Sequence, residues 1–371
     1  MNMKILYCIH ALRNFGGTER MLAIKANYLA QHLSYDIVVV TSAQNGQPFS
    51  FNLFPDIRHI DIGIDFYRHH LRNKFALALE RCIREEKPDI CVSFSNDDLP
   101  IIARINDGSI KIAEYHFPYQ RYQLERKGLF GAMRAWLKTH KIRKAAARMD
   151  AFVVLTKTDQ KLWNLPNCLV IGNPSHLPAP QKTASSHSKH FLALGRLEKE
   201  KNFQEMIRIW EDVVAKGSEY VLDIYGDGSL RQELQDLIEH GALNGHIQLH
   251  HSTNNVDSVM MGGYGILMTS MFEGFPLSLV ESLSFGLPII SYDCPNGPAE
   301  IIDDGVNGYL IPVGDKQSFA NKIIELTHNE QLWNTLHQGA LESAQKYSMK
   351  TIMSQWDSLF NRLYEERKTS R

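Results

Sequence analysis

The chain lacks the short motifs with which proteins most often hold a metal ion or a nicotinamide cofactor. Its five cysteines form no C-x-x-C pair, its sixteen histidines show no H-E-x-x-H spacing, and no Asp-x-Asp occurs. No G-x-G-x-x-G follows a predicted strand. These absences argue against a metal site, and they make a nicotinamide oxidoreductase a poor interpretation. The scattered cysteines are expected to be small buried residues.

Long apolar runs and a leader sequence are also missing. No run approaches the roughly 18 apolar residues that a membrane-spanning helix needs. The first residues, MNMKILYCIHAL, have neither a basic region nor a small-residue cleavage site, and they are typical of a first strand. We therefore expect the protein to stay in the cytoplasm.

The bulk numbers indicate two globular domains of unlike charge. The chain has 371 residues, of which 44% are hydrophobic and 22% charged, and this length exceeds one ordinary core. The net charge of −1 hides an asymmetry, because residues 1–173 carry 24 Lys and Arg against 16 Asp and Glu, and residues 174–371 carry 16 against 25. The first half should prefer an anionic surface or ligand.

Short β-branched runs alternate with helical patterns along the whole chain. The predicted strands are 4–10, 35–42, 57–62, 89–94, 111–116, 150–156, 169–173, 191–196, 220–227, 247–252, 264–270, 288–293 and 308–313. The predicted helices are 18–33, 72–86, 130–148, 202–216, 229–241, 276–286, 316–328 and 350–368. Runs such as IVVV are apolar without alternation, which favours parallel strands buried on both faces. The order predicts two doubly wound, Rossmann-like domains facing a central cleft.

The domain boundaries follow from a segment rich in proline and serine. NPSHLPAPQKTASSHSKH contains three prolines and four serines without apolar periodicity, which is typical of a linker. We expect an N-terminal domain at 1–173, a linker at 174–189 and a second domain at 190–349. The terminal helix, 350–371, is expected to cross back and pack on the first domain.

Two loops at predicted strand ends carry groups suited to an anion. Gly16 and Gly17 permit a tight turn before a helix, whose free N–H groups attract negative charge. In GRLEKEKNF, Arg196 ends a strand and Lys201 precedes the next helix, a combination that suits a diphosphate. An ordinary turn and a solvated charged loop are the competing interpretations.

Two glutamates flank an apolar helix in MFEGFPLSLVESLSFGLP. Glu273 precedes a Gly-Phe-Pro break, and Glu281 lies inside the predicted helix among Leu279 and Val280. A buried carboxylate is costly unless it is paired or hydrogen-bonded. We interpret both as acceptors for sugar hydroxyls rather than as an acid–base pair. The competing interpretation is a helix-terminal charge and a solvated glutamate.

The motifs in order resemble glycosyltransferase family 4. They are GGTER, EYHFPY, GRLEKEKNF, YGDGSLR, the two glutamates with seven residues between them, and NGPAEIIDDGVNGYLIPVGD. The likeness covers nearly the whole chain and is stronger in its second half. It implies a retaining, nucleotide-sugar-dependent enzyme of GT-B fold, similar to bacterial glycosyltransferases of polysaccharide and lipid-linked glycan assembly.

The resemblance implies a role for each of these positions. In the first domain, Gly16 and Gly17 would lie against the donor diphosphate, and His116 would stand beside the reacting centre. In the second, Arg196 and Lys201 would bind the diphosphate. The donor-sugar and nucleotide contacts would come from Glu273, Gly274, Phe275, Pro276 and Glu281, with Asn254 or Asn255 near the base.

The expected mechanism uses fixed positive charge instead of a metal. Departure of the nucleotide leaves negative charge on the β-phosphate, which Arg196 and Lys201 would stabilise. We therefore expect no cofactor and activity that EDTA does not affect. His116 is the simplest general base, but we favour a positioning and electrostatic role for it.

The acceptor is predicted to bind the basic first domain. Residues 121–148 hold nine Lys and Arg and one Glu, with Phe130, Met133, Trp136 and Leu137 at roughly helical spacing. This pattern suits a helix on an anionic membrane surface. A core helix with a solvated basic face is the alternative. The resemblance implies a glycan acceptor carried on polyprenyl diphosphate, and a peripheral protein on the inner face of the membrane.

Other functions fit the residues less well. A sugar-nucleotide 2-epimerase of GT-B fold would consume donor without acceptor, and an inactive nucleotide-sugar-binding protein would bind without turnover. A nucleic-acid partner is not expected, because the aromatic spacing is not that of a base-stacking surface. Tyr292–Glu300, YDCPNGPAE, resembles members that use UDP-hexoses or UDP-N-acetylhexosamines.

Overall fold

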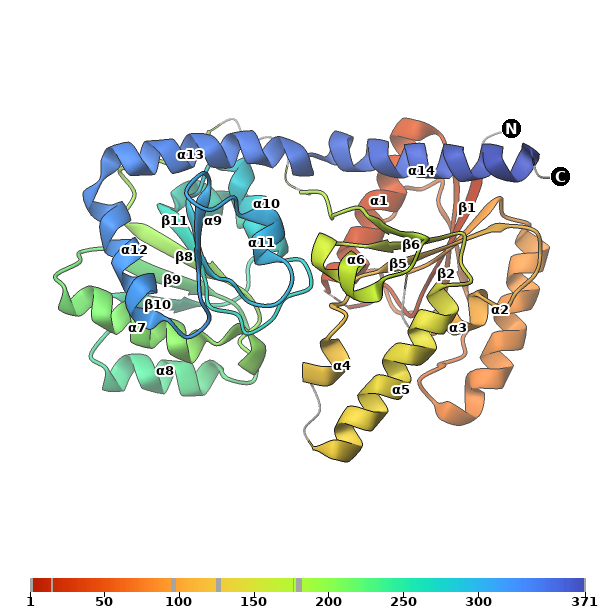
Figure 1. Cartoon of the computed structure of the whole chain (residues 1–371), viewed down its shortest axis with the longest axis horizontal. Helices are drawn as coiled ribbons and strands as arrows, with labels where there is room; N and C mark the ends of the chain where they lie inside the picture. Colours follow the sequence, from red (N-terminus) through yellow and green to blue (C-terminus); the bar gives the residue numbers. More distant parts are fainter. Residues whose placement is uncertain are drawn as a thin grey trace. The chain divides into compact units, whose positions relative to one another are not determined.

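The chain folds as two compact units (Figure 1). The computed structural model describes residues 3–369 apart from 15, 95–97, 125–127, 176 and 178–181. Unit 1 comprises Met1–Asn173 and Ile352–Arg371, and unit 2 comprises Pro174–Thr351. Parts of the basic segment 121–148, the predicted linker 174–189 and the terminal helix 350–371 lie outside the described residues.

Unit 1 is built on a parallel sheet of seven strands in the order β3-β2-β1-β4-β5-β6-β7. Its strands are β1 (Lys4–Ile9), β2 (Asp36–Thr41), β3 (Arg58–Asp61), β4 (Ile90–Ser93), β5 (Ile110–Tyr115), β6 (Ala151–Val154) and β7 (Cys168–Val170). Its helices are α1 (Gly17–Leu33), α2 (Arg72–Glu86), α3 (Leu99–Ile102), α4 (Arg121–Leu124), α5 (Leu129–Ala146) and α6 (Lys157–Trp163), with most of α14 (Met349–Thr369). The strand β5 is buried throughout, and β2 is buried after its first residue, because helices cover both faces (Figure 1).

Successive side chains of the first sheet point to opposite faces. Cys8, Val40 and Ala113 pack in one apolar cluster with residues of α2, α3 and α5. Tyr7 and Glu114 are also buried, and Glu114 meets α1 through Lys25. The helix α14 belongs to this unit through contacts such as Tyr35 Oη, which donates to Asp357 at 2.6 Å.

Unit 2 is built on a parallel sheet of six strands in the order β10-β9-β8-β11-β12-β13. Its strands are β8 (His190–Leu194), β9 (Val221–Tyr225), β10 (Ile247–His250), β11 (Gly265–Met268), β12 (Ile289–Tyr292) and β13 (Gly308–Ile311). Its helices are α7 (Phe203–Ala215), α8 (Arg231–His240), α9 (Val256–Gly262), α10 (Leu277–Ser284), α11 (Pro298–Ile301), α12 (Lys316–His328) and α13 (Glu330–Ala344). The helix α7 buries Phe203, Ile207 and Trp210, whose spacing places one apolar stripe against the sheet.

The predicted fold class of two Rossmann-like α/β domains is confirmed. The sequence reading missed α13, whose Asn329 side chain caps its first turn by accepting from Leu332 N. Described residues of the predicted linker hydrogen-bond within unit 2, as Ala184 N does to Phe285 O at 2.8 Å. Among the described residues, no helix is long and apolar enough to cross a bilayer.

Candidate functional site

The loop after β8 is held in place by backbone contact with the loop after β9. A Cβ on Gly226 would lie 1.9 Å from Gly195 O, and one on Gly228 would lie 2.4 Å from Leu197 O. Neither Gly226 nor Gly228 has a positive φ, so both glycines are needed for close approach rather than for a left-handed turn. Ser229 adds two hydrogen bonds to the Glu198 carboxylate, at 2.9 and 2.7 Å. The stretch that carries Arg196 and Lys201 is therefore fixed mainly through its backbone.

Lys201 and Glu273, predicted separately, meet in the structure. Lys201 Nζ donates to Glu273 Oε1 at 2.6 Å, and Ser270 Oγ donates to the same oxygen at 2.6 Å. The two charged side chains are 19% and 11% exposed. An ammonium group has three protons, so Lys201 keeps two for other acceptors. A cation and a carboxylate thus lie side by side where β8 and β11 end.

Arg196 is not part of this contact. Its side chain is 75% exposed and pairs with Glu200, four residues along the chain, at 2.6 Å. An exposed pair of this kind contributes at most about 1 kcal/mol and is easily exchanged for a ligand. Arg196 is therefore an exposed cation on the loop after β8, unlike the largely buried Lys201.

The loop after Glu273 packs against the loop 295–297. Glu273 N donates to Pro295 O at 3.3 Å, and Gly297, at φ +84°, lies so close that a Cβ there would be 2.5 Å from Pro276 Cδ. Pro276 stands at the N-cap position of α10, one residue before the helix that was predicted to begin with it. Gly274 stays partly exposed, whereas Phe275 is buried. Gly274 thus lies, partly exposed, two residues before the N-cap of α10.

Glu281 lies more than one turn into α10 and is only 4% exposed. Its apolar neighbours Leu279, Val280 and Leu283 are fully buried. The solvated glutamate that the sequence left as an alternative is therefore excluded.

Asn254 and Asn255 do not contact the Lys201–Glu273 pair through any hydrogen bond among the described residues. Both are exposed, and Asn255 lies at the start of α9, where its N–H donates to Thr253 Oγ1 at 3.0 Å. The neighbouring Ser252 and His251 hydrogen-bond to Asp227 and lower the pKa of that carboxyl. The predicted role near a nucleotide base stays a prediction.

No thiol near the site is a good nucleophile. Burial, with help from the charge of Glu273, raises the pKa of Cys294 to about 12. In the part of the chain that the structure describes, no three His, Cys, Asp or Glu residues are grouped to hold a metal ion.

In unit 1, Gly16 lies at the N-cap of α1, as the predicted turn requires. A Cβ on Gly16 would lie 2.2 Å from Glu19 Oε2, so the helix start already faces a carboxylate. Asn14 Nδ2 donates to the other oxygen of Glu19 at 3.3 Å. An external anion could meet the amides of Gly16 and Gly17 only if Glu19 moved away.

His116 follows β5 and its side chain is only 5% exposed. Nε2 lies 3.1 Å from Glu114 Oε1, although the ring is turned out of ideal hydrogen-bond geometry. The ring packs on Phe94 with the centroids 4.4 Å apart. His116 is therefore held by its surroundings rather than free on the surface.

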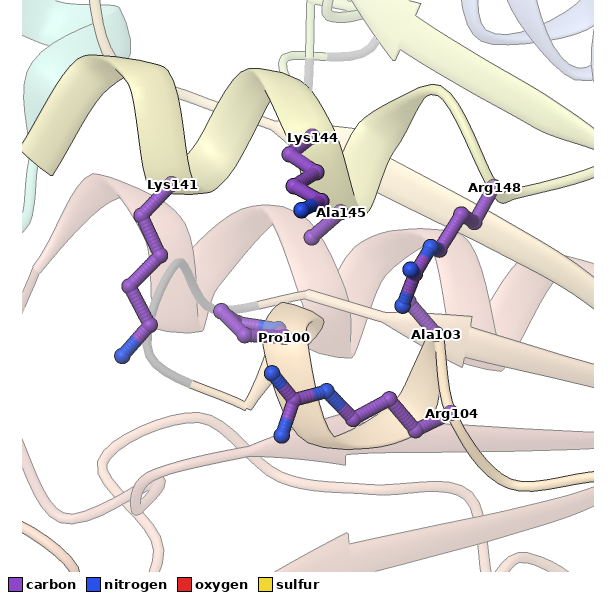
Figure 2. Close-up of a pocket in the computed structure, with 7 residues that line it drawn as sticks. All are labelled: Pro100, Ala103, Arg104, Lys141, Lys144, Ala145 and Arg148. Atoms are coloured by element: carbon purple, nitrogen blue, oxygen red, sulfur yellow. The ribbon is translucent and has the colours of Figure 1, made fainter.

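A basic hollow lies between α3 and α5 (Figure 2). Arg104, Lys141, Lys144 and Arg148 line this cavity of about 120 Å³, together with Pro100 and two alanines. In Figure 2, Lys141 and Lys144 project from α5 on the side where Arg104 lies. None of the four cations pairs with a carboxylate of the described residues. We call this cavity the basic hollow.

The sequence analysis overlooked two buried polar features. Lys25 and Glu114 form an ion pair inside unit 1; Lys25 is the single charge in the apolar segment MLAIKANYLA, and Glu114 lies in the predicted strand KIAEYH. Asn296, at φ +62°, is 6% exposed, and neither polar atom of its side chain has a hydrogen-bond partner among the described residues. A lone charge in a predicted core segment was the available signal for the first of these.

Comparison with known proteins gives a consistent result. Residues 179–343 match the family described as glycosyl transferases group 1. The amylovoran biosynthesis glycosyltransferase AmsD of Erwinia amylovora is 27% identical over 368 residues, which cover 96% of this chain and 99% of that protein.

Solved structures share the fold across both units. A mutant of Staphylococcus aureus TarM, in complex with fondaparinux, alpha-GlcNAc-glycerol and UDP, superposes with a TM-score of 0.80 at 16% identity over 97% of this chain and 100% of that one. Anabaena HepE in complex with UDP-glucose superposes with a TM-score of 0.74 at 16% identity, over 97% of this chain and 100% of that one. At such low identity these structures establish the fold alone.

Proposed function

We propose, from the premise that this chain is a glycosyltransferase with a group 1 domain over residues 179–343, that it transfers a hexose or N-acetylhexosamine from a UDP-sugar to a hydroxyl of a glycan acceptor, with retention. The observation that carries the proposal is the contact between Lys201 and Glu273 beside the start of α10. UDP is favoured as the donor nucleotide because the relatives of like fold were solved with UDP or UDP-glucose.

The donor contacts divide by charge. Lys201 has two protons left for diphosphate oxygens, and Arg196 can exchange its exposed Glu200 partner for the same ligand. Glu273 and the amide of Gly274 offer an acceptor and a donor to sugar hydroxyls. Glu281 is assigned the ribose hydroxyls, which requires that the buried carboxylate be reached from the open end of α10.

The chemistry proposed is bond cleavage assisted by fixed positive charge. As the anomeric bond breaks, negative charge grows on the β-phosphate, and a cation held there stabilises the transition state more than the ground state. Lys201 suits this role because its ammonium group donates to Glu273, which Ser270 also holds, and because its stem lies against Gly195. His116 would position a reacting hydroxyl, with no covalent intermediate on the protein and no metal.

The acceptor is proposed to be lipid-linked and to approach unit 1. The exposed apolar side chains of α5 are Phe130 (82%), Met133 (54%), Trp136 (60%) and Leu137 (52%). The basic hollow lies further along the same helix, where its unpaired cations suit phosphoryl groups (Figure 2). Apolar side chains together with cations favour a helix at an anionic membrane surface.

A thermal-shift panel of UDP-, GDP- and ADP-sugars tests the donor proposal. A ligand at about 100 times its Kd stabilises by about 2.7 kcal/mol, which is readily measured. We expect UDP-sugars to raise the Tm most. Glu281→Ala should then raise the donor KM with little loss of kcat, and Arg196→Ala should lower kcat by about 10²-fold. No shift with any of the three nucleotides would refute the proposal, and turnover of donor without acceptor would indicate an epimerase.

Sedimentation with vesicles tests the membrane proposal. Binding to vesicles that contain phosphatidylglycerol at low salt should disappear at about 1 M salt, where the Debye length falls to about 3 Å. Trp136→Ser should weaken binding, while Leu77→Ser, which changes another exposed apolar residue of unit 1, should not. Absence of binding at low salt would exclude the surface role of α5.

A further inference from the structure

Unit 1 contains a buried charge network that the proposed donor chemistry does not use. Glu114 on β5 is 3% exposed, and Lys25 on α1 is 1% exposed. Lys25 Nζ donates to Glu114 Oε1, and His116 Nε2 lies 3.1 Å from the same oxygen. Glu114 Oε2 is buried without a hydrogen-bond partner among the described residues. One carboxylate oxygen therefore accepts a hydrogen bond from Lys25 and lies next to Nε2 of His116, whose ring is turned out of hydrogen-bond geometry.

The network is enclosed by aromatic rings. Lys25 Nζ stands 4.9 Å from the ring centroid of Trp356 on α14 and 5.8 Å from that of Phe94. The ring of Phe94 also packs on His116. Burial of an ion pair is costly, and apolar residues of similar size often stabilise a protein equally well. Stability alone therefore gives a poor account of charges at these positions.

The charges act on each other in a defined direction. Burial alone would raise the pKa of Glu114, but the positive charges of Lys25 and His116, together with the hydrogen-bonding groups of both residues, outweigh it and lower that pKa. Burial lowers the pKa of Lys25, and Glu114 counteracts that effect. Lys25 thus supports the carboxylate form that His116 faces.

We propose that Glu114 is a positioning residue, which fixes the His116 ring so that Nε2 carries its proton and Nδ1 accepts a hydrogen bond from a substrate hydroxyl. A neutral imidazole has one N–H and one acceptor nitrogen, and the nitrogen that faces a carboxylate carries the proton. Lys25 supplies the countercharge. The inference rests on the proposed role of His116 in glycosyl transfer.

The tautomer can be measured on the whole protein without substrate. In protein labelled with ¹⁵N-histidine, long-range ¹H–¹⁵N correlation distinguishes the two neutral tautomers, and His116→Ala identifies the signal. We expect a single Nε2–H tautomer at pH values where the ring is neutral. A ring protonated at Nδ1, or an even mixture of tautomers, would overturn the proposal whether or not any variant folds.

A double variant tests the consequence for turnover. Lys25→Met with Glu114→Leu removes both charges of the ion pair together, so neither charge is left buried without the other, and we expect the variant to fold. The matched control is Lys111→Met with Asp107→Leu, which removes another ion pair at the opposite end of β5. The side chains of Lys111 and Asp107 are 9% and 5% exposed. UDP release should fall by about 10- to 100-fold in kcat for the first variant, with the donor KM unchanged, and should stay at the wild-type level in the control.

Failure of the inference and failure of the proposed function give different results. If His116→Ala loses turnover but Lys25→Met with Glu114→Leu keeps it, the positioning role is refuted and the role of His116 stands. If His116→Ala keeps full turnover, the role of His116 itself is refuted, and the positioning role with it.

Discussion

Replacing Lys201 with methionine separates its contribution to stability from its contribution to chemistry. The change removes the ammonium group and keeps most of the aliphatic stem that covers Gly195. Glu273 then loses its ion pair and retains only Ser270 as a hydrogen-bond donor among the described partners of that oxygen.

The magnitude follows from the burial of the pair. Breaking a fully buried ion pair costs about 3–5 kcal/mol and breaking an exposed one at most about 1 kcal/mol. At 19% and 11% exposure, with Ser270 still in place, we expect a loss of about 2 kcal/mol. For a unit of this size that lowers the Tm by about 4–8 °C. If Lys201 also faces the leaving diphosphate, kcat should fall by about 10²- to 10³-fold.

A second substitution distinguishes the two effects. Lys201→Met with Glu273→Gln leaves no unpaired charge, so the Tm should return toward the wild-type value while turnover stays low. Lys189→Met serves as the control. It breaks the ion pair of Lys189 with Glu219, whose side chains are 53% and 81% exposed, and it should change neither the Tm nor the turnover. The assays are differential scanning fluorimetry and UDP release. Turnover of Lys201→Met within about threefold of wild type would refute the diphosphate role.

Three further predictions concern other parts of the molecule. Gly226→Ala should destabilise unit 2 by about 3 kcal/mol or more in urea unfolding, because its Cβ meets a backbone oxygen, whereas Gly245→Ala, with open space around it, should be neutral; equal effects would refute the close-approach argument. Folding lowers the pKa of Glu114, so the Glu114 carboxylate stabilises the protein above about pH 4.3, and this stabilisation is lost as the pH falls through the lowered pKa. The stability of Lys25→Met with Glu114→Leu should therefore depend less on pH in this acid range than the stability of the wild type. EDTA should leave UDP release unchanged, and restoration by added Mg²⁺ after an EDTA-induced loss would contradict charge stabilisation by Arg196 and Lys201.

Local patterns were sufficient to predict most elements of the fold. Three elements, β2, β5 and α12, lie within one or two residues of their predicted bounds. Burial on both faces of a strand and helical periodicity both produce patterns among neighbouring residues, which a sequence shows directly. The helix α13 was missed, although its capping asparagine and Trp333, Leu336 and Ala340 carry a helical pattern.

The candidate site was predictable in its residues but not in its contacts. Lys201 and Glu273 were both selected, yet they lie 72 positions apart in the sequence, which gives no sign that they touch. Arg196, expected to act with Lys201, pairs with Glu200 in the structure. An exposed side chain can pair with any of several nearby charges, and the sequence does not show which of them it contacts. The Lys25–Glu114 pair depends on tertiary packing between a helix and a distant strand.

The glycine contacts at Gly226 and Gly228 bear on how this protein can change. Since the main chain rather than the side chains fixes the course of residues 195–201, substitutions of outward-facing positions such as Lys199 should leave the orientation of that segment intact. A mutant library can therefore vary Lys199 without changing the course of this segment, provided that Gly226 and Gly228 are kept and Arg196 and Lys201 are left in place.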